Sequence, residues 1–209
     1  MKSTNLLMIV AVVAVSLAAI NLIVTINKVG DIQALTGYAT DTATANLTVQ
    51  GAASITFVIS NISWGSGYVN ESPITFAVLD TVGNTINGTN WATVSTGLTL
   101  RNDGNNDVTI NLSADKNSTQ FIGGTAGNGP IFQWNVSNAE EGSCSNGGTN
   151  NATNITSFTD ANITSQLACW NLSNDAASDL LRIDLRLEIP QDAAPGAKGV
   201  TITANATTI

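Results

Sequence analysis

Short runs of alternating apolar and polar residues are the feature of this sequence that most restricts its fold. The clearest run is LLRIDLRLEIP at 180–190, where leucine or isoleucine occupies every second position and charged residues lie between them. Side chains of a β-strand point alternately to opposite faces, so this pattern predicts a strand with one face in a core. Helical spacing does not fit the run.

Shorter runs of the same kind recur along the chain, separated by Gly, Asn, Asp and Pro. They predict strands at 45–50, 53–60, 74–80, 92–101, 107–114, 130–137, 167–173, 180–189 and 197–206. Many short strands with little helical periodicity indicate a mainly β fold, and we expect an antiparallel β-sandwich or jelly roll over 45–209.

Two segments of this region raise more specific expectations. The run at 53–60 is apolar on both faces, which predicts either a central strand or one that a partner covers. The segment RNDGNND at 101–107 spaces Asp and Asn like the start of a calcium loop, but it lacks the glycine and the glutamate that an EF-hand requires. Its Asp-Gly pair predicts a hairpin turn instead. The Asn- and Thr-rich stretch at 143–166 is expected to be a loop.

The N-terminal segment is the one expected helix. Residues 6–25 carry no charge, and twenty helical residues span about 30 Å, the thickness of a membrane's apolar core. We expect a hydrophobic helix over 1–28 and a linker over 29–44. The segment also fits a signal peptide cleaved after Ala18, but its long apolar run favours retention.

A retained helix would mediate assembly, with Asn21 available for a hydrogen bond across a helix interface. A lone anchor in lipid is the alternative. If the segment is cleaved, the apolar alternation from Ile20 to Ile26 predicts a strand for a neighbour's sheet. The candidate assembly residues are Leu6, Ile9, Val13, Leu17, Ile20, Asn21 and Val24.

Charge and composition exclude several functions. The chain has 7 basic and 15 acidic residues and a formal net charge of −8, and no basic stripe forms, so we expect no binding to nucleic acid. It contains no histidine, which removes Ser-His and Cys-His pairs and imidazole metal ligands. We therefore expect a protein that is not an enzyme and holds no metal or cofactor.

The only two cysteines are Cys144 and Cys169. In an exported protein such a pair predicts one disulfide, whereas in the cytosol the two would be free thiols. A pair cannot form a zinc site without further Cys or His ligands. The apolar N-terminal segment and the many Asn-x-Ser/Thr sequons indicate export and favour the disulfide.

Asn-x-Ser/Thr sequons are more frequent than composition explains. Twelve of the 25 asparagines begin one, whereas Ser and Thr make up only 44 of 209 residues and chance would give about five. The excess predicts N-glycosylation and export, although an Asn- and Thr-rich composition is the competing explanation. The candidate acceptors are Asn46, Asn61, Asn70, Asn87, Asn111, Asn117, Asn135, Asn151, Asn154, Asn162, Asn171 and Asn205.

Two similar five-residue segments place an acceptor directly after a tryptophan: WNVSN at 134–138 and WNLSN at 170–174. In a strand, Asn and the Ser two residues later share one face while the tryptophan points to the other. We therefore predict that Trp134 and Trp170 lie in the core, with Asn135 and Asn171 on the solvent face.

The chain resembles subunits of archaeal extracellular filaments, the threads and bundling pili, and bacterial biofilm-matrix fibre proteins of the camelysin type. The features that carry the resemblance are the apolar N-terminus, GLTLRNDGNNDVTINLSA at 97–114 and LRLEIPQDAAPGAKGVTITANAT at 185–207. The resemblance implies a heavily glycosylated jelly-roll subunit that polymerises by giving an N-terminal strand to its neighbour. A retained helix looks more like that of type IV pilins, but the basic-Gly cleavage site and early glutamate of many such pilins are missing.

Together these patterns favour a structural subunit of an archaeal cell-surface filament, located outside the cell. Its expected partners are further copies of itself, a membrane before assembly, and covalent N-glycans. The alternative is a membrane-anchored surface glycoprotein or S-layer-associated binding module. A carbohydrate-binding domain is a weaker third hypothesis, because the tryptophans fall mostly on predicted core faces.

Overall fold

The computed structural model of the chain describes residues 8, 11–22, 51–71, 73–146, 149–150 and 153–209. The chain divides into two units, 1–48 and 49–209. In the first unit residues 11–22 are helical, so the described helix is shorter than the segment predicted from the sequence. The expected linker and the expected strand at 45–50 lie outside the described residues.

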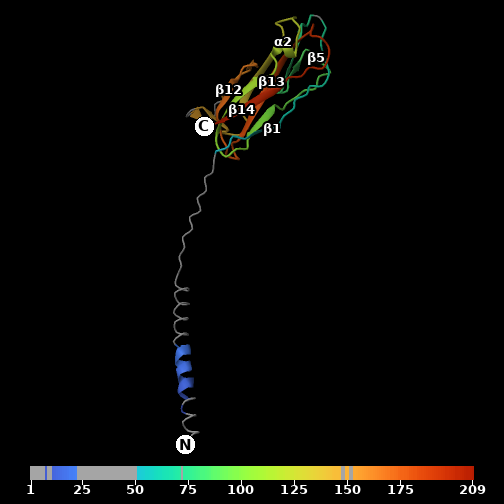
Figure 1. Ribbon diagram of the computed structural model, residues 1–209. Coiled ribbons are helices and arrows are strands. Elements are labelled where there is room, and N and C mark those ends of the chain that lie inside the picture. Colours follow the sequence, from blue (N-terminus) through green and yellow to red (C-terminus); the bar gives the residue numbers. More distant parts are fainter. Residues whose placement is uncertain (1–7, 9–10, 23–50, 72, 147–148, 151–152) are drawn as a thin grey trace. The chain divides into compact units, whose positions relative to one another are not determined.

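The second unit is mainly antiparallel β (Figure 1). A seven-stranded sheet is formed by β1 (Ile55–Ile59), β3 (Phe76–Asp80), β4 (Thr85–Ile86), β6 (Leu98–Asn102), β8 (Ile131–Asn138), β11 (Thr159–Asp160) and β13 (Leu180–Pro190). A five-stranded sheet has the order β10 (Thr149–Asn150), β9 (Cys144–Asn146), β12 (Gln166–Leu172), β7 (Val108–Ala114) and β14 (Ile202–Thr208). A small third sheet pairs β2 (Tyr68–Val69) with β5 (Gly88–Thr89).

Strand β13 is the centre of the seven-stranded sheet. One of its edges pairs first with β6 and then with β3, and its other edge pairs with β8. The alternation that predicted this strand is confirmed, because its inward side chains are buried: Leu181, Ile183, Leu185 and Leu187. The residues between them were expected to face solvent, yet Asp184 and Glu188 are buried as well.

The Asp184 carboxylate tolerates burial because polar groups surround it. It accepts hydrogen bonds from the Thr81 hydroxyl at 2.7 Å and from the Arg182 guanidinium at 2.8 Å. The same guanidinium donates to the Thr81 and Ser95 carbonyls. A buried charge without such partners would be strongly destabilising. Thr81 thus joins β13 to the chain between β3 and β4.

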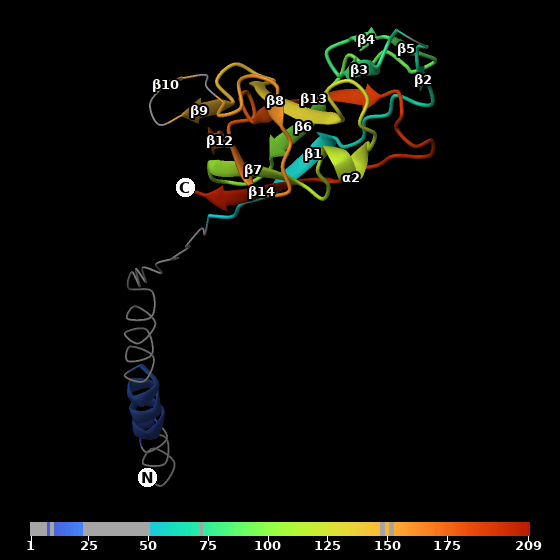
Figure 2. The ribbon, with the colours of Figure 1, turned by 90° about the horizontal axis from the view of Figure 1, so that it is seen from above.

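Both larger sheets contribute to one hydrophobic core. Phe132 and Trp134 enter it from β8, and Ile110 and Leu112 enter it from β7. The rings of Phe121, Phe132 and Trp134 make successive edge contacts, with centroids 5.3 and 6.2 Å apart. In Figure 2, β7, β12 and β14 lie together on one side of β8 and β13. This shared core positions the strands of both larger sheets.

The structure excludes one of the two alternatives for 53–60 and corrects the expectation for 101–107. Strand β1 is at an end of its sheet, paired with β6 alone among the described strands, and Val58 is 52% exposed. It is therefore not a central strand. Strands β6 and β7 belong to different sheets, so 103–107 forms a corner between sheets and not a hairpin turn. A turn motif cannot show which partner the next strand will choose.

The corner between β6 and β7 is held by the Asn102 side chain, which is almost fully buried. Its Nδ2 donates to the Asn106 carbonyl at 2.9 Å and lies 3.2 Å from each of the Leu172 and Ser173 carbonyls. Its Oδ1 accepts from the Gly104 amide. One amide group therefore ties the end of β6 to the end of β12.

Some elements were not expected from the sequence. The segment 143–166 was predicted to be a loop but contains β9, β10 and β11. Strands β2, β4 and β5 and the short helix α2 (Ser118–Phe121) were also missed. Helix α2 begins with a capping box between Asn117 and Gln120, which satisfies its first backbone donors.

An acidic side chain fastens the segment after α2 to the connection between β13 and β14. Asp192 accepts hydrogen bonds from the Ala126 amide at 2.9 Å and from the amide and hydroxyl of Thr125. Hydrogen bonds from the Ala126 and Thr125 amides hold the pKa of Asp192 below its ordinary value of 3.8. Because the pKa of Asp192 is lower in the folded than in the unfolded state, the stabilisation from these hydrogen bonds is fully present above the unfolded-state pKa. It is lost as the pH falls through the folded-state pKa.

We therefore expect the Asp192 carboxyl resonance to titrate below pH 3.8 in the folded protein, with the Thr125 and Ala126 amide shifts following the same midpoint. In Asp192→Asn both amides should exchange with solvent faster at neutral pH, while the amide of Leu187 in β13 should be unaffected. NMR titration and hydrogen exchange measure these effects. Amide shifts that do not follow the carboxyl would contradict the contact.

Candidate modification and assembly sites

The predicted disulfide is confirmed. Cys144 and Cys169 are bonded, with their Cα atoms 5.8 Å apart, and both are fully buried. The bond links β9 to β12 within the five-stranded sheet, where Cys144 is in register with Leu172. The disulfide therefore lies on the core side of the sheet and encloses the segment that carries three of the predicted acceptors.

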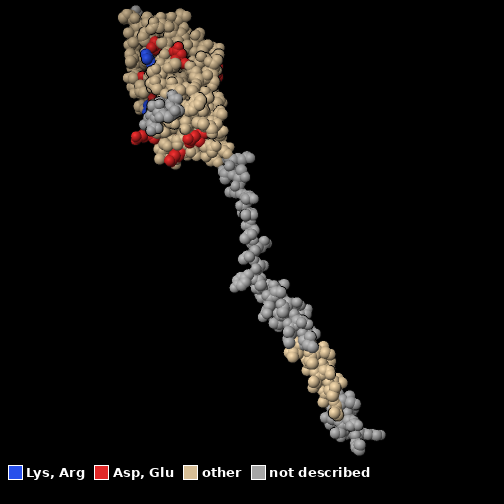
Figure 3. Space-filling view, turned by 90° about the vertical axis from the view of Figure 1, so that its left-hand side faces the viewer, with Lys and Arg blue, Asp and Glu red and all other residues tan. Residues whose placement is uncertain are grey.

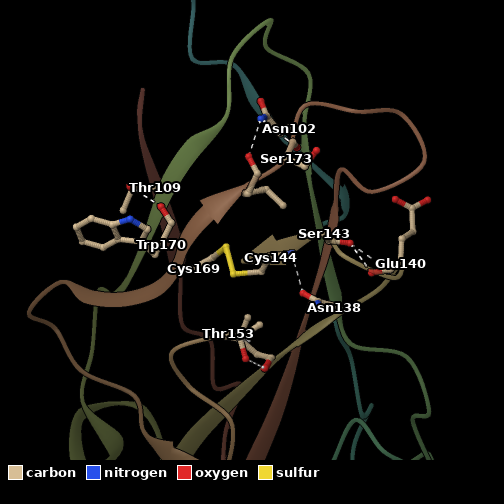
Figure 4. The surroundings of a disulfide bond; sticks show 12 residues. Asn102, Thr109, Asn138, Glu140, Ser143, Cys144, Thr153, Cys169, Trp170 and Ser173 are labelled. Carbon is tan, nitrogen blue, oxygen red and sulfur yellow. Dashed lines mark hydrogen bonds between the residues drawn. A yellow bond between two sulfur atoms is a disulfide. The ribbon is translucent and has the colours of Figure 1, made fainter. Parts of the chain in front are cut away.

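Hydrogen bonds fix the chain on both sides of the disulfide (Figure 4). The Cys144 amide donates to the Asn138 side chain at 2.9 Å, and the Ser173 amide donates to the Ser143 carbonyl at 3.0 Å. The Thr153 hydroxyl donates to the Val136 carbonyl at 2.6 Å. These contacts join β8, β9 and the residues around Thr153 into one cross-linked region.

The predicted acceptor asparagines differ in accessibility. Five are exposed: Asn61, Asn117, Asn154, Asn162 and Asn205. Five are half-buried: Asn70, Asn87, Asn111, Asn135 and Asn171. The remaining two, Asn46 and Asn151, lie outside the described residues. None of the ten described acceptors is in the core. Their positions are compatible with glycosylation, which stays a prediction.

The two tryptophan-containing segments, 134–138 and 170–174, do not have the same geometry. Trp134 is fully buried, as the alternation predicted. Asn135 was predicted on the solvent face and is half-buried, with its Oδ1 shielded from solvent. Trp170 was predicted to lie in the core but is 49% exposed. The pairing of β12 with β7 shifts register on each side of Cys169, and an extra residue in one strand turns the following side chains to the other face.

The disulfide supplies a signal that sequence reasoning missed at Trp170. A cysteine bonded across the core side of a sheet has to point inward, and here Cys169 is fully buried. The residue after it then points outward by the alternation of the strand. Alternation with a core-facing Trp170 would place Cys169 on the solvent face, whereas the disulfide holds Cys169 on the core side.

The candidate assembly residues fall partly within the described helix. Val13, Leu17 and Ile20 have exposed side chains, as do their apolar neighbours over 11–22. Asn21 lies at the end of this helix and is exposed. Leu6, Ile9 and Val24 lie outside the described residues. In the part of the chain that the structure describes, no helix is long and apolar enough to cross a membrane.

Few charges mark the surface of the β-rich unit. On the face drawn in Figure 3, most of the described surface carries neither basic nor acidic side chains. Among the residues with described positions, no three acidic, Cys or His side chains are placed to hold one metal ion. In the segment 101–107, Asp103 contacts Arg101 and Asp107 accepts from the Asn174 amide, so their carboxylates serve separate contacts.

Comparison with known proteins gives no relative from which a role can be transferred: no protein-family model, curated protein or solved structure matches this chain.

Proposed function

We propose that this protein is a structural subunit of an archaeal cell-surface filament, assembled through its apolar N-terminal segment and carrying N-glycans on a β-sandwich. The sandwich is supported by the single core to which both larger sheets contribute. The role is non-enzymatic and extracellular in this proposal. A buried disulfide supports export, because such bonds persist mainly in oxidising compartments.

The observation that carries the proposal is the uncovered apolar helix. Over 11–22 every described side chain is exposed, and the sequence there contains no charge. Water disfavours an apolar surface of this kind, so it is expected to be covered by lipid or by further copies of the helix. Small residues along the helix, such as Ala14 and Ala18, allow close approach of a second helix.

The sheet edges support a second route for contacts between copies. In the described part of the chain, β1 and β14 each pair on one side only. Neither strand contains a charged residue or a proline, the residues that commonly protect an edge from further pairing. A strand from a neighbouring copy could therefore extend either sheet.

Deletion of residues 1–28 tests the proposal. The full-length protein is expected to form filaments of regular diameter under negative-stain electron microscopy, and the deleted protein is expected to remain monomeric in size-exclusion chromatography. Circular dichroism should show that both forms keep their β structure. A full-length protein that stays dispersed as monomers in lipid vesicles would contradict the proposal and favour the membrane-anchored binding module.

Two matched double variants distinguish contacts made by the helix from nonspecific hydrophobic association. Val13→Asn with Leu17→Asn places two amides on the helix and should abolish or strongly reduce polymerisation. Val82→Gln with Ile163→Gln changes two exposed apolar residues of the β-rich unit without creating a sequon and should leave polymerisation unchanged. Equal effects of the two pairs would contradict a specific role of the helix.

A further inference from the structure

The outer face of the five-stranded sheet has an unusual composition over its strands β7, β12 and β14. None of these three strands contains a charged residue. Strands β7 and β14 are in register over seven pairs, so their outward side chains form rows of hydroxyls and amides. These rows are Thr203 with Ser113, Asn205 with Asn111, and Thr207 with Thr109.

Trp170 provides the one large exposed apolar side chain on these three strands, among the residues that the structure describes. The Thr109 hydroxyl donates to the Trp170 carbonyl at 2.7 Å, which places the tryptophan next to that row. Figure 4 shows the indole beside Thr109 and directed away from the disulfide. An indole thus lies on a face that otherwise carries neutral polar groups and the half-buried Leu167, which is opposite Asn111.

Two predicted glycan acceptors belong to the same face. Asn111 follows Thr109 by two residues in β7 and therefore points to the same side, directly opposite Asn205 of β14. Asn111 is in register with Leu167 of β12, and Trp170 lies beside Thr109, two residues from Asn111 along β7. Diagonal neighbours on adjacent antiparallel strands are about 7–8 Å apart, which is within reach of an aromatic side chain. Asn111 on the middle strand is closer to β12 than Asn205 on the edge strand.

This chemistry suits a neutral sugar. One face of a pyranose ring consists of C–H groups that pack on an aromatic ring, while its hydroxyls hydrogen-bond to amides and hydroxyls such as those of Thr109 and Asn111. A face without charge offers nothing to an ionic ligand. A protein partner would need a larger apolar centre than one indole.

We infer that the first sugars of an N-glycan on Asn111 pack against the Trp170 indole of the same chain. Trp170 then acts as a binding residue for the protein's own glycan and fixes the direction in which that glycan leaves the sheet. This inference rests on the glycosylation contained in the proposed function.

Hydroxyl-radical footprinting of the full-length chain, secreted from a host that N-glycosylates Asn-x-Ser/Thr, tests the inference. Mass spectrometry of the same peptides reports both glycan occupancy and side-chain oxidation. When Asn111 carries a glycan, oxidation of Trp170 should be several-fold slower than in Asn111→Gln. Oxidation of Tyr68, which is exposed on a different sheet, should be equal in both and serves as the control.

Three results would overturn the inference. Fast Trp170 oxidation with Asn111 occupied would overturn it while leaving glycosylation intact. Slow Trp170 oxidation that persists in Asn111→Gln, or that speeds up only in Asn205→Gln, would show that a group other than the Asn111 glycan shields the indole. No glycan on Asn111 would overturn it as well, and a protein without glycan on any sequon would also contradict the glycosylation in the proposed function.

Discussion

Replacing Trp134 with alanine is expected to lower the free energy of unfolding by about 3–5 kcal/mol, the cost typical of removing a large aromatic side chain from a core. Trp134 is fully buried, its ring meets that of Phe132, and it is in register with Leu185 of the central strand. The cavity would therefore open where β8 and β13 pack against the opposite sheet. Urea unfolding followed by circular dichroism measures the loss.

Trp170→Ala is the matched control, because it removes the same side chain from the same sequence context. We expect a change within about 0.5 kcal/mol in unglycosylated protein, as for most surface substitutions. Roughly half of the Trp170 side chain already contacts solvent. Equal losses for the two variants would contradict the assignment of one tryptophan to the core and the other to the surface.

Removal of the disulfide is expected to cost about 3 kcal/mol of unfolding free energy, since a cross-link restricts the unfolded chain. Cys144 and Cys169 are 25 residues apart in sequence. The double variant Cys144→Ala with Cys169→Ala should unfold at a lower urea concentration than the oxidised wild type. Adding an oxidant should not restore the lost stability of the double variant, because no thiol remains to form a disulfide.

Reduction of the wild type supplies the control for this double variant. Dithiothreitol should lower the stability of the wild type to about that of the variant and leave the variant itself unchanged. A double variant as stable as the oxidised wild type would show that the cross-link contributes nothing. A reduced wild type that is much more stable than the variant would instead assign the loss to the alanine side chains.

The alternating pattern predicted much of the fold correctly because the alternation of side chains between the two faces of a regular strand is a local property of the backbone. Strands β7, β8 and β13 lie where the pattern predicted them, with Ile110, Trp134 and Ile183 buried. The pattern failed where pairing with other segments decides the structure. Strands β9 to β11 lie in a segment too rich in Asn and Thr to show alternation, and they are stabilised by their partners and by the disulfide.

The candidate sites were predictable to a similar extent. The disulfide followed from the presence of only two cysteines, and the acceptor positions followed from a three-residue pattern. The exposure of Trp170 did not follow from local alternation, because a register shift between two strands reverses the faces. The choice of β6 and β7 to enter different sheets was likewise set by the tertiary structure.

The buried Asn102 side chain has a consequence for how the molecule folds. Its hydrogen bonds to Leu172 and Ser173 connect positions 70 and 71 residues apart, and they join a strand of one sheet to a strand of the other. The Leu172 and Ser173 carbonyls therefore gain these hydrogen bonds only when the end of β6 is in place beside the end of β12. Long-range contacts of this kind slow folding and make it cooperative, so both sheets should appear in a single kinetic phase on a timescale of milliseconds to seconds.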